Sequence, residues 1–242
     1  MEKSDFWWLS SSERGRYYYT EFGHHKPICD DEDPSSVNWD TNTYSINELE
    51  HWRDKFQNIN VYRSLKIASD SLGGEEIIGP FLVDIDNNDE NLEDALVVTR
   101  KTFYLLRDEF RVDNNNLRIF FTGHKGFNIE IRPQDLDIHG SANDQIIKSA
   151  HVLHQITEIL RRGKSWQFIN CVSDVGTVID QIYGNRFCYK LKHTYIRLHS
   201  SRNIWISSDG KTKTRMKIEL TVNELNKLPV IEIVSRAEKP VT

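Results

Sequence analysis

The chain has 242 residues, of which 38% are hydrophobic and 28% are charged, and its formal net charge is −5. This composition is typical of a globular protein and excludes a disordered chain. No apolar run approaches the roughly 20 residues that span a bilayer, and the N-terminus lacks the pattern of a signal peptide. We therefore expect a cytoplasmic protein with no membrane partner.

Charge is distributed unevenly along the chain. Residues 30–33 are all acidic, whereas residues 186–217 contain nine Lys and Arg against one acid, Asp209. Such a basic stretch can bind phosphates locally although the whole chain is acidic. The alternative is two solvated faces of opposite sign, which composition alone favours. The three cysteines are widely spaced and do not indicate a disulfide framework.

Hydrophobic periodicity, capping patterns and turn residues predict the order of the secondary structure. In chain order, the predicted elements are a loop over 23–44, a helix from Ser45 to about 57, strands over 59–67 and 77–84, a helix over 90–111, strands over 117–121 and 127–131, a helix over 144–161, short strands from about 166, and a small helix from Thr221.

This order predicts a mixed α+β fold. We expect residues 1–75 to form an N-terminal α/β module that carries the acidic loop, and residues 76–242 to form a metal-binding catalytic module. The two modules would share one active site.

The first candidate site lies at the end of the strand that contains Asp84 and Asp86. Alternate side chains of a strand share a face, so both carboxylates point the same way. Two adjacent negative charges repel unless a cation neutralises them, and Mg²⁺ or Mn²⁺ prefers such oxygen ligands. Alone, an Asp-x-Asp pattern is a weak signal, and locally a strand that runs into a turn over residues 87–89 is the favoured interpretation.

The second candidate is a short loop between two strands, Thr122-Gly123-His124-Lys125-Gly126. The two glycines let backbone amides approach a ligand closely. Thr122, His124 and Lys125 supply donors suited to phosphate oxygens. The alternative is a β-hairpin turn with exposed Lys and His, which local chemistry again favours.

Two further patterns follow. Asp180 comes after a short apolar stretch, with Asp174 as a rival acid. Residues 195–203 then alternate as a strand with basic side chains, and Lys211, Lys213 and Lys217 follow. These cations could form a clamp for a triphosphate, in which Arg suits bidentate contacts better than Lys.

The order of these patterns resembles the catalytic core of the archaeo-eukaryotic primase superfamily. It comprises Asp-x-Asp after an apolar strand, a Gly-x-Lys-Gly loop between strands, a later Ile-Asp, and Ile-Arg-Leu-x-x-Ser-x-Asn. The resemblance covers about residues 60–226. It implies a primase-type core, in which an N-terminal α/β module packs on an RRM-like β-sheet module, and it implies DNA primase or primase-polymerase activity in DNA replication, repair or defence.

The resemblance also implies roles for particular residues. The acids that would bind two Mg²⁺ or Mn²⁺ ions are Asp84, Asp86 and Asp180. The predicted nucleotide-binding residues are Thr122, Gly123, His124, Lys125, Gly126, Asn128, Arg197, Ser201 and Asn203. Asn128 and Asn203 stand where many members have His. Asn can donate a hydrogen bond to phosphate but carries no charge, so His124, His193 or His199 could compensate.

The implied reaction is template-directed addition of a nucleotide from an NTP or dNTP. The expected partners are a single-stranded DNA template and the nucleotide, with a helicase or a further primase domain or subunit as a candidate partner. The main alternative is a catalytically reduced module of the same fold that binds nucleic acid or nucleotide. A metal-dependent nuclease and a purely structural α+β domain are the remaining interpretations.

Overall fold

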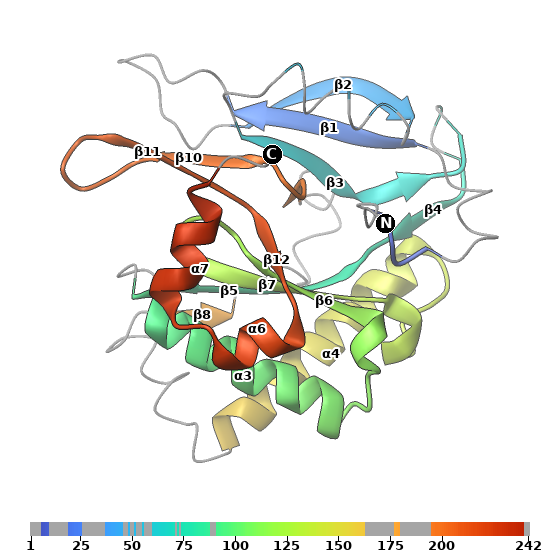
Figure 1. Cartoon of the computed structure of the whole chain (residues 1–242). Coiled ribbons are helices and arrows are strands. Elements are labelled where there is room, and N and C mark those ends of the chain that lie inside the picture. Colours follow the sequence, from blue (N-terminus) through green and yellow to red (C-terminus); the bar gives the residue numbers. More distant parts are fainter. Residues whose placement is uncertain are drawn as a thin grey trace.

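Two five-stranded antiparallel β-sheets, a separate two-stranded hairpin and a layer of helices make up the described part of the protein (Figure 1), which confirms the predicted α+β class. The structure is a computed structural model, and it describes residues 6–9, 19–25, 37–45, 48, 51, 55, 60–70, 72, 74–87, 91–162, 177–179 and 195–239.

The central sheet has five strands in the order β12-β6-β7-β5-β8, and all neighbouring strands are antiparallel. Its strands are β5 (Phe81–Asn87), β6 (Leu117–Phe121), β7 (Gly126–Ile131), β8 (Thr177–Ile179) and β12 (Ile218–Leu220). The predictions for 117–121 and 127–131 are confirmed. The strand predicted over 77–84 is two strands, β5 and the short β4 (Glu76–Ile78).

Two long helices cover one face of this sheet (Figure 1). They are α3 (Leu92–Asp108) and α4 (Ala142–Arg162), and both were predicted. The side chain of Asn91 accepts a hydrogen bond from the amide of Asp94 and caps α3. Phe103 of α3, Leu153 of α4 and Ile129 of β7 are fully buried in one core. Since side chains alternate along a strand, this face of the sheet is apolar and the opposite face carries the polar residues.

A second sheet lies over that polar face (Figure 1). Its strand order is β2-β1-β3-β4, with β9 also paired to β3. The strands are β1 (Tyr19–His25), β2 (Val37–Ser45), β3 (Val61–Ala68), β4 and β9 (Tyr195–Arg197). The strand predicted over 59–67 is confirmed as β3.

The loop predicted over 23–44 is wrong for the residues at both of its ends, which belong to β1 and β2. These polar segments form strands because β1 pairs with β3 and β2 pairs with β1. A sheet partner can override a weak local preference. Residues 26–36 lie outside the described residues. In the helix predicted after Ser45, His51 and Lys55 are helical, and Glu48 accepts a hydrogen bond from the Ser45 amide at 2.9 Å.

β4 and β9, which follow residue 75, share this sheet with β1 and β3, which precede it. The division into modules 1–75 and 76–242 stays a prediction.

The N-terminal residues 6–9 enter the interior. Phe6, Trp8 and Leu9 are buried against Val61 and Leu198. A Cβ atom added to Gly79 would lie 2.8 Å from the Trp8 ring. Glycine therefore permits this close approach of the ring to the backbone.

The C-terminal part adds a hairpin and two short helices. The hairpin consists of β10 (Arg202–Ile206) and β11 (Thr212–Met216) and projects from the body of the protein (Figure 1). The helices are α6 (Val222–Lys227), which was predicted, and α7 (Val230–Ala237), which was not. Within the described ranges, no helix has the length and apolar character needed to cross a membrane.

The cap of α6 offers a test of the fold. Thr221 accepts a hydrogen bond from the Glu224 amide at 3.2 Å, and Glu224 accepts one from the Thr221 amide at 2.7 Å. We expect Thr221→Ala to lower the free energy of unfolding by about 1 kcal/mol. Urea denaturation measures this loss. Lys227→Ala, an exposed change in the last turn of the same helix, should cost less than about 0.5 kcal/mol. Equal losses would contradict the capping role.

Candidate active site

Asp84 and Asp86 project from β5 on the face opposite the helices. Val83 and Ile85 are fully buried in the core. Asp84 and Asp86, which alternate with them along the strand, are only partly buried. This is the alternation expected of a strand with one apolar face. The carboxylates therefore share one face, as the sequence pattern predicted.

The Gly-flanked loop lies directly beside these acids because β5 pairs with β7. In the register of this pair, Asp84 faces Asn128 and Asp86 faces Gly126. The Asn128 side-chain amide donates a hydrogen bond to Asp84 Oδ1. Lys125 Nζ lies 3.0 Å from Asp86 Oδ2. Each acid thus has a polar partner from the loop or the strand that follows it.

The backbone of the loop turns tightly between β6 and β7. Both the amide and the hydroxyl of Thr122 donate to the Gly126 carbonyl, at 3.1 and 3.0 Å. Gly123 has φ of +90°, a conformation that side chains disfavour. A Cβ atom on Gly126 would collide with the Ile85 carbonyl and the Asp86 carboxylate. Glycine at 126 therefore allows the loop to approach the acidic strand.

Arg197 and Asn203 converge on this loop from a different part of the chain. Arg197 Nη1 and Asn203 Nδ2 both donate to the Thr122 carbonyl, at 3.2 and 3.0 Å. Arg197 Nη2 donates to the Tyr62 hydroxyl at 2.8 Å and its guanidinium lies over the Tyr62 ring. Arg197 Nε is buried and makes no hydrogen bond to the described residues. Arg197 and Asn203 therefore both hold the loop at the Thr122 carbonyl.

The remaining predicted residues lie as follows. His124 stacks on Trp205 of β10, with ring centroids 4.3 Å apart. The Ser201 hydroxyl donates to the Leu198 carbonyl at 2.6 Å and closes the turn after β9. Asp180 lies outside the described residues.

The chemistry of the acid pair fits Mg²⁺ or Mn²⁺, which prefer hard carboxylate oxygens. Asp86 has 14% of its side chain exposed. The described residues contain no group of three His, Cys, Asp or Glu side chains able to hold a metal ion. β8, which precedes Asp180 in the sequence, pairs with β5 and places Ile179 opposite Ile85.

Sequence reasoning missed a buried ionic cluster on the same polar face, which consists of Arg118, Glu130, His199, Lys217 and Glu219. Glu130 Oε1 lies 3.0 Å from Lys217 Nζ, and both side chains are 0% exposed. Arg118 makes two hydrogen bonds to Glu219, at 2.7 and 3.0 Å. A Glu between Ile129 and Ile131 of a buried strand was the signal that could have revealed the cluster.

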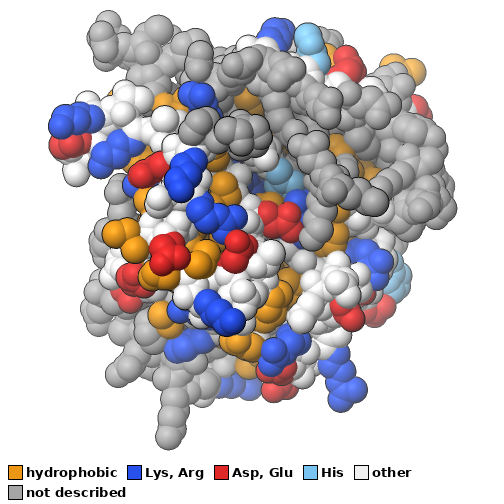
Figure 2. Space-filling model, viewed as in Figure 1, with side chains coloured by type: hydrophobic (Ala, Val, Ile, Leu, Met, Phe, Trp, Pro, Cys, Tyr) orange, Lys and Arg blue, Asp and Glu red, His pale blue; other side chains and the backbone are white. Residues whose placement is uncertain are grey.

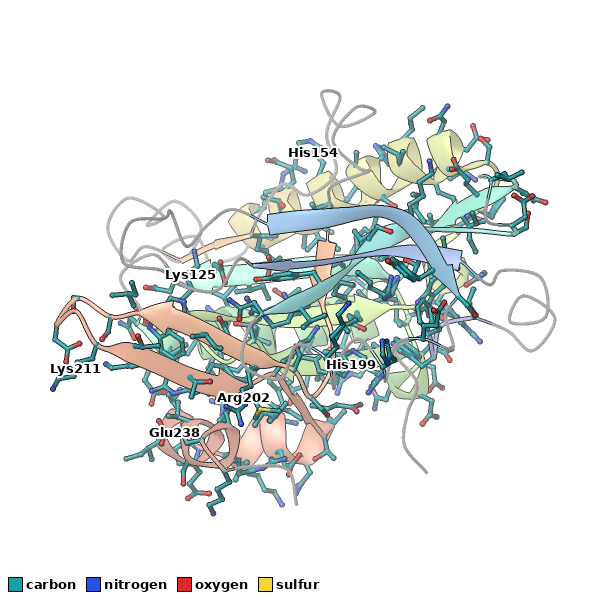
Figure 3. The ribbon with its side chains drawn as sticks, turned by 90° about the horizontal axis from the view of Figure 1, so that it is seen from above. Lys125, His154, His199, Arg202, Lys211 and Glu238 are labelled. Atoms are coloured by element: carbon teal, nitrogen blue, oxygen red, sulfur yellow. The ribbon has the colours of Figure 1, made fainter. Side chains whose placement is uncertain are left out.

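This cluster changes two earlier interpretations. Lys217 is fully buried on Glu130 and does not belong to an exposed triphosphate clamp. His199 contacts Glu130 and Arg118, and it stacks on Phe120 at 4.2 Å. It lies well apart from Lys125 of the loop (Figure 3), and both of its ring nitrogens contact side chains of the cluster rather than the loop.

The cluster also sets the ionisation of Glu130. Complete burial by itself would raise the pKa of this carboxyl. The charge of Lys217 and the contact with His199, followed by the charge of Arg118, outweigh burial and lower the pKa of Glu130 far below its usual value. Glu130 is therefore an anion in the folded protein.

No known protein-family model and no curated protein matches this chain. Among solved structures, the chain is similar to the polymerase domain of ligase D from Mycobacterium tuberculosis in complex with DNA. The two share 12% sequence identity with a TM-score of 0.49, and the alignment covers 92% of this chain and 82% of that chain. At these values the similarity by itself assigns neither a family nor an activity.

The lowered pKa of Glu130 predicts a pH dependence of stability. The folded protein binds fewer protons at this group than the unfolded chain, so its contribution is present above the ordinary pKa of 4.5 and is lost as pH falls toward the folded pKa. We expect the free energy of unfolding to fall with pH below about 4.5. Denaturation across pH should show a shallower fall in Glu130→Gln. The change Glu232→Gln at an exposed position of α7 should keep the wild-type slope, and an unchanged slope in Glu130→Gln would contradict the assignment.

Proposed function

We propose that this chain is a metal-dependent nucleotidyltransferase of the primase-polymerase type, which adds nucleotides from NTPs or dNTPs on a DNA template. One observation carries the proposal. The acid pair Asp84 and Asp86 lies beside a glycine-flanked loop whose Lys125 reaches Asp86. Ligands suited to a divalent cation and donors suited to phosphate therefore occupy adjacent positions, as phosphoryl transfer requires.

In this proposal, Asp84 and Asp86 hold Mg²⁺ or Mn²⁺ together with Asp180. The pairing of β8 with β5 supports the choice of Asp180, because it brings the chain to the acidic strand immediately before that residue. When bound, two such ions activate the attacking oxygen and offset charge on the leaving pyrophosphate.

Lys125 and Arg197 are proposed to bind the triphosphate. Lys125 has 38% of its side chain exposed, so its ammonium group can move from Asp86 to a phosphate oxygen without unfolding the loop. Arg197 is anchored at both ends of its guanidinium, and its buried Nε is a donor that no described residue uses. A fixed guanidinium stabilises the charge that develops on phosphate oxygens.

The template is proposed to follow the β10–β11 hairpin. The space-filling view shows Lys and Arg side chains at the projecting end of the hairpin, with an acidic side chain among them (Figure 2). Arg202, Lys211 and Lys213 are exposed. Asp209 lies 3.7 Å from Lys211 and offsets part of this charge. Phosphate contacts of this kind are independent of base sequence.

Primer extension on a DNA template tests the activity. With Mg²⁺ or Mn²⁺ and either NTPs or dNTPs, we expect the wild type to extend a labelled primer. Asp84→Ala and Asp86→Ala should lower the rate by at least about 1000-fold, because each removes a metal ligand. Circular dichroism verifies that the variants fold. Asp108→Ala, an exposed acid at the end of α3, should keep the wild-type rate.

Each result has a distinct meaning. Extension by the Asp84→Ala variant at the wild-type rate would contradict the proposed site. Binding of nucleotide without extension by the folded wild type would favour the binding-module alternative, and degradation of the labelled DNA would favour the nuclease.

The Lys125–Asp86 ion pair leads to a second prediction. We expect Lys125→Met to tighten the binding of Mn²⁺ in the absence of nucleotide by about tenfold, because the competing ammonium group is removed from Asp86. The same change should weaken the binding of a non-hydrolysable triphosphate. Calorimetric titrations measure both affinities. Lys125→Arg keeps the charge, so its changes in Mn²⁺ affinity and in triphosphate affinity should both be smaller than those of Lys125→Met. Parallel losses of both affinities would contradict competition at Asp86.

A further inference from the structure

The polar face that carries the acid pair continues into the buried ionic cluster. Glu130 follows Asn128 by two residues on β7, so the two side chains share that face. Asn128 contacts Asp84, whereas Glu130 is completely enclosed. One strand therefore presents the candidate active site near its start and a buried anion near its end.

Every partner of Glu130 comes from another part of the chain. Its Oε1 atom contacts Lys217 Nζ at 3.0 Å and His199 Nε2 at 3.3 Å, and its Oε2 atom accepts from Trp7 Nε1 at 3.3 Å. Arg118 Nη1 lies 3.3 Å from His199 Nδ1. Since a guanidinium only donates, Nδ1 accepts and Nε2 donates to Glu130. The carboxylate is thus satisfied by three separate donors.

Lys217 connects this anion to the segment that carries Arg197. Its ammonium group also donates to the Arg197 carbonyl at 3.1 Å. Its backbone amide donates to the Ser201 carbonyl at 2.9 Å, and its carbonyl accepts from the Ser200 amide at 3.2 Å. Lys217 therefore holds residues 197–201 at three points, while the side chain at the start of this segment reaches the Thr122 carbonyl of the loop.

A buried ion pair is a costly way to stabilise a core, because both charges lose their hydration. Apolar residues of similar volume are often as stable or more stable in such positions. The directional contacts of Lys217 do what an apolar side chain could not do, since they fix a carbonyl position at the end of β9. Fixing the position of this carbonyl therefore explains the buried ion pair better than a gain in folding stability does.

We propose that Glu130 and Lys217 are a positioning pair, which holds Arg197 and the turn through Ser201 against the Gly-flanked loop over 122–126. The role at the triphosphate rests on the proposed function, whereas the positioning of the segment does not. Neither residue touches the nucleotide in this proposal. Both act through the backbone of the strand that carries Arg197.

Three variants test the pair. Lys217→Met removes the ammonium group and keeps an unbranched stem. Glu130→Gln/Lys217→Met also removes the carboxylate charge, so that no uncompensated charge stays buried and folding is preserved. Leu225→Ala is the matched control, because Leu225 belongs to α6 and its side chain is fully buried in the core. The control lowers stability without touching the segment.

Hydrogen exchange of the peptide that spans residues 195–203 is the first measurement. We expect exchange of this peptide to be about tenfold faster in both Lys217 variants, relative to peptides from α3, and unchanged in Leu225→Ala. Unchanged exchange in the Lys217 variants, or an equal increase in the control, would overturn the proposal. This result requires no ligand.

Affinity for a non-hydrolysable triphosphate with Mn²⁺ is the second measurement. We expect the charge-balanced double variant to bind it about tenfold more weakly, while its affinity for Mn²⁺ alone stays within about twofold, because Asp84 and Asp86 are untouched. Equal loss of both affinities would indicate general disorder and would overturn the proposal. If the wild type binds no triphosphate, the proposed function fails, and hydrogen exchange still decides the positioning role.

Discussion

The antiparallel pairing of β5 with β7 is the interaction on which the candidate site depends. Its register sets Asp84 opposite Asn128 and Asp86 opposite Gly126. A slip by one residue would turn the carboxylates into the apolar core, because alternate side chains occupy opposite faces. The large apolar residues of both strands prevent that slip, since they are buried under α3 and α4. The hydrophobic core thus determines where the acids point.

The two faces of the central sheet have different physical roles. The face under the helices supplies apolar burial, which is the main favourable term in folding. The other face, covered by the second sheet, carries charged groups that need specific partners when water is removed. The ionic cluster around Glu130 satisfies that requirement at one end. The acid pair at the other end is only partly buried, so under the proposed function it can exchange its polar partners for a cation.

The second sheet also explains why residues far apart in sequence meet at the loop. β9 pairs with β3, so that Arg197 faces Tyr62 across the two strands. From this position the guanidinium reaches the Thr122 carbonyl. Asn203 reaches the same carbonyl from β10. β9 and β10, which belong to the C-terminal part of the chain, therefore support the Gly-flanked loop, which lies near the middle of the sequence.

The sequence by itself determined the elements with strong periodicity or clear end signals. These include α3, α4, β6, β7 and the capping box of α6, because period and capping are local properties. The shared face of Asp84 and Asp86 also followed from alternation alone. Only the tertiary structure decided that polar segments before residue 45 form β1 and β2, since β1 pairs with the distant β3 and β2 pairs in turn with β1. It also decided the contacts of Lys217 and His199, which pattern alone placed near a phosphate. A charged side chain carries no local sign of its partner, and the partner here is Glu130, 87 residues from Lys217 in sequence and completely buried beside it.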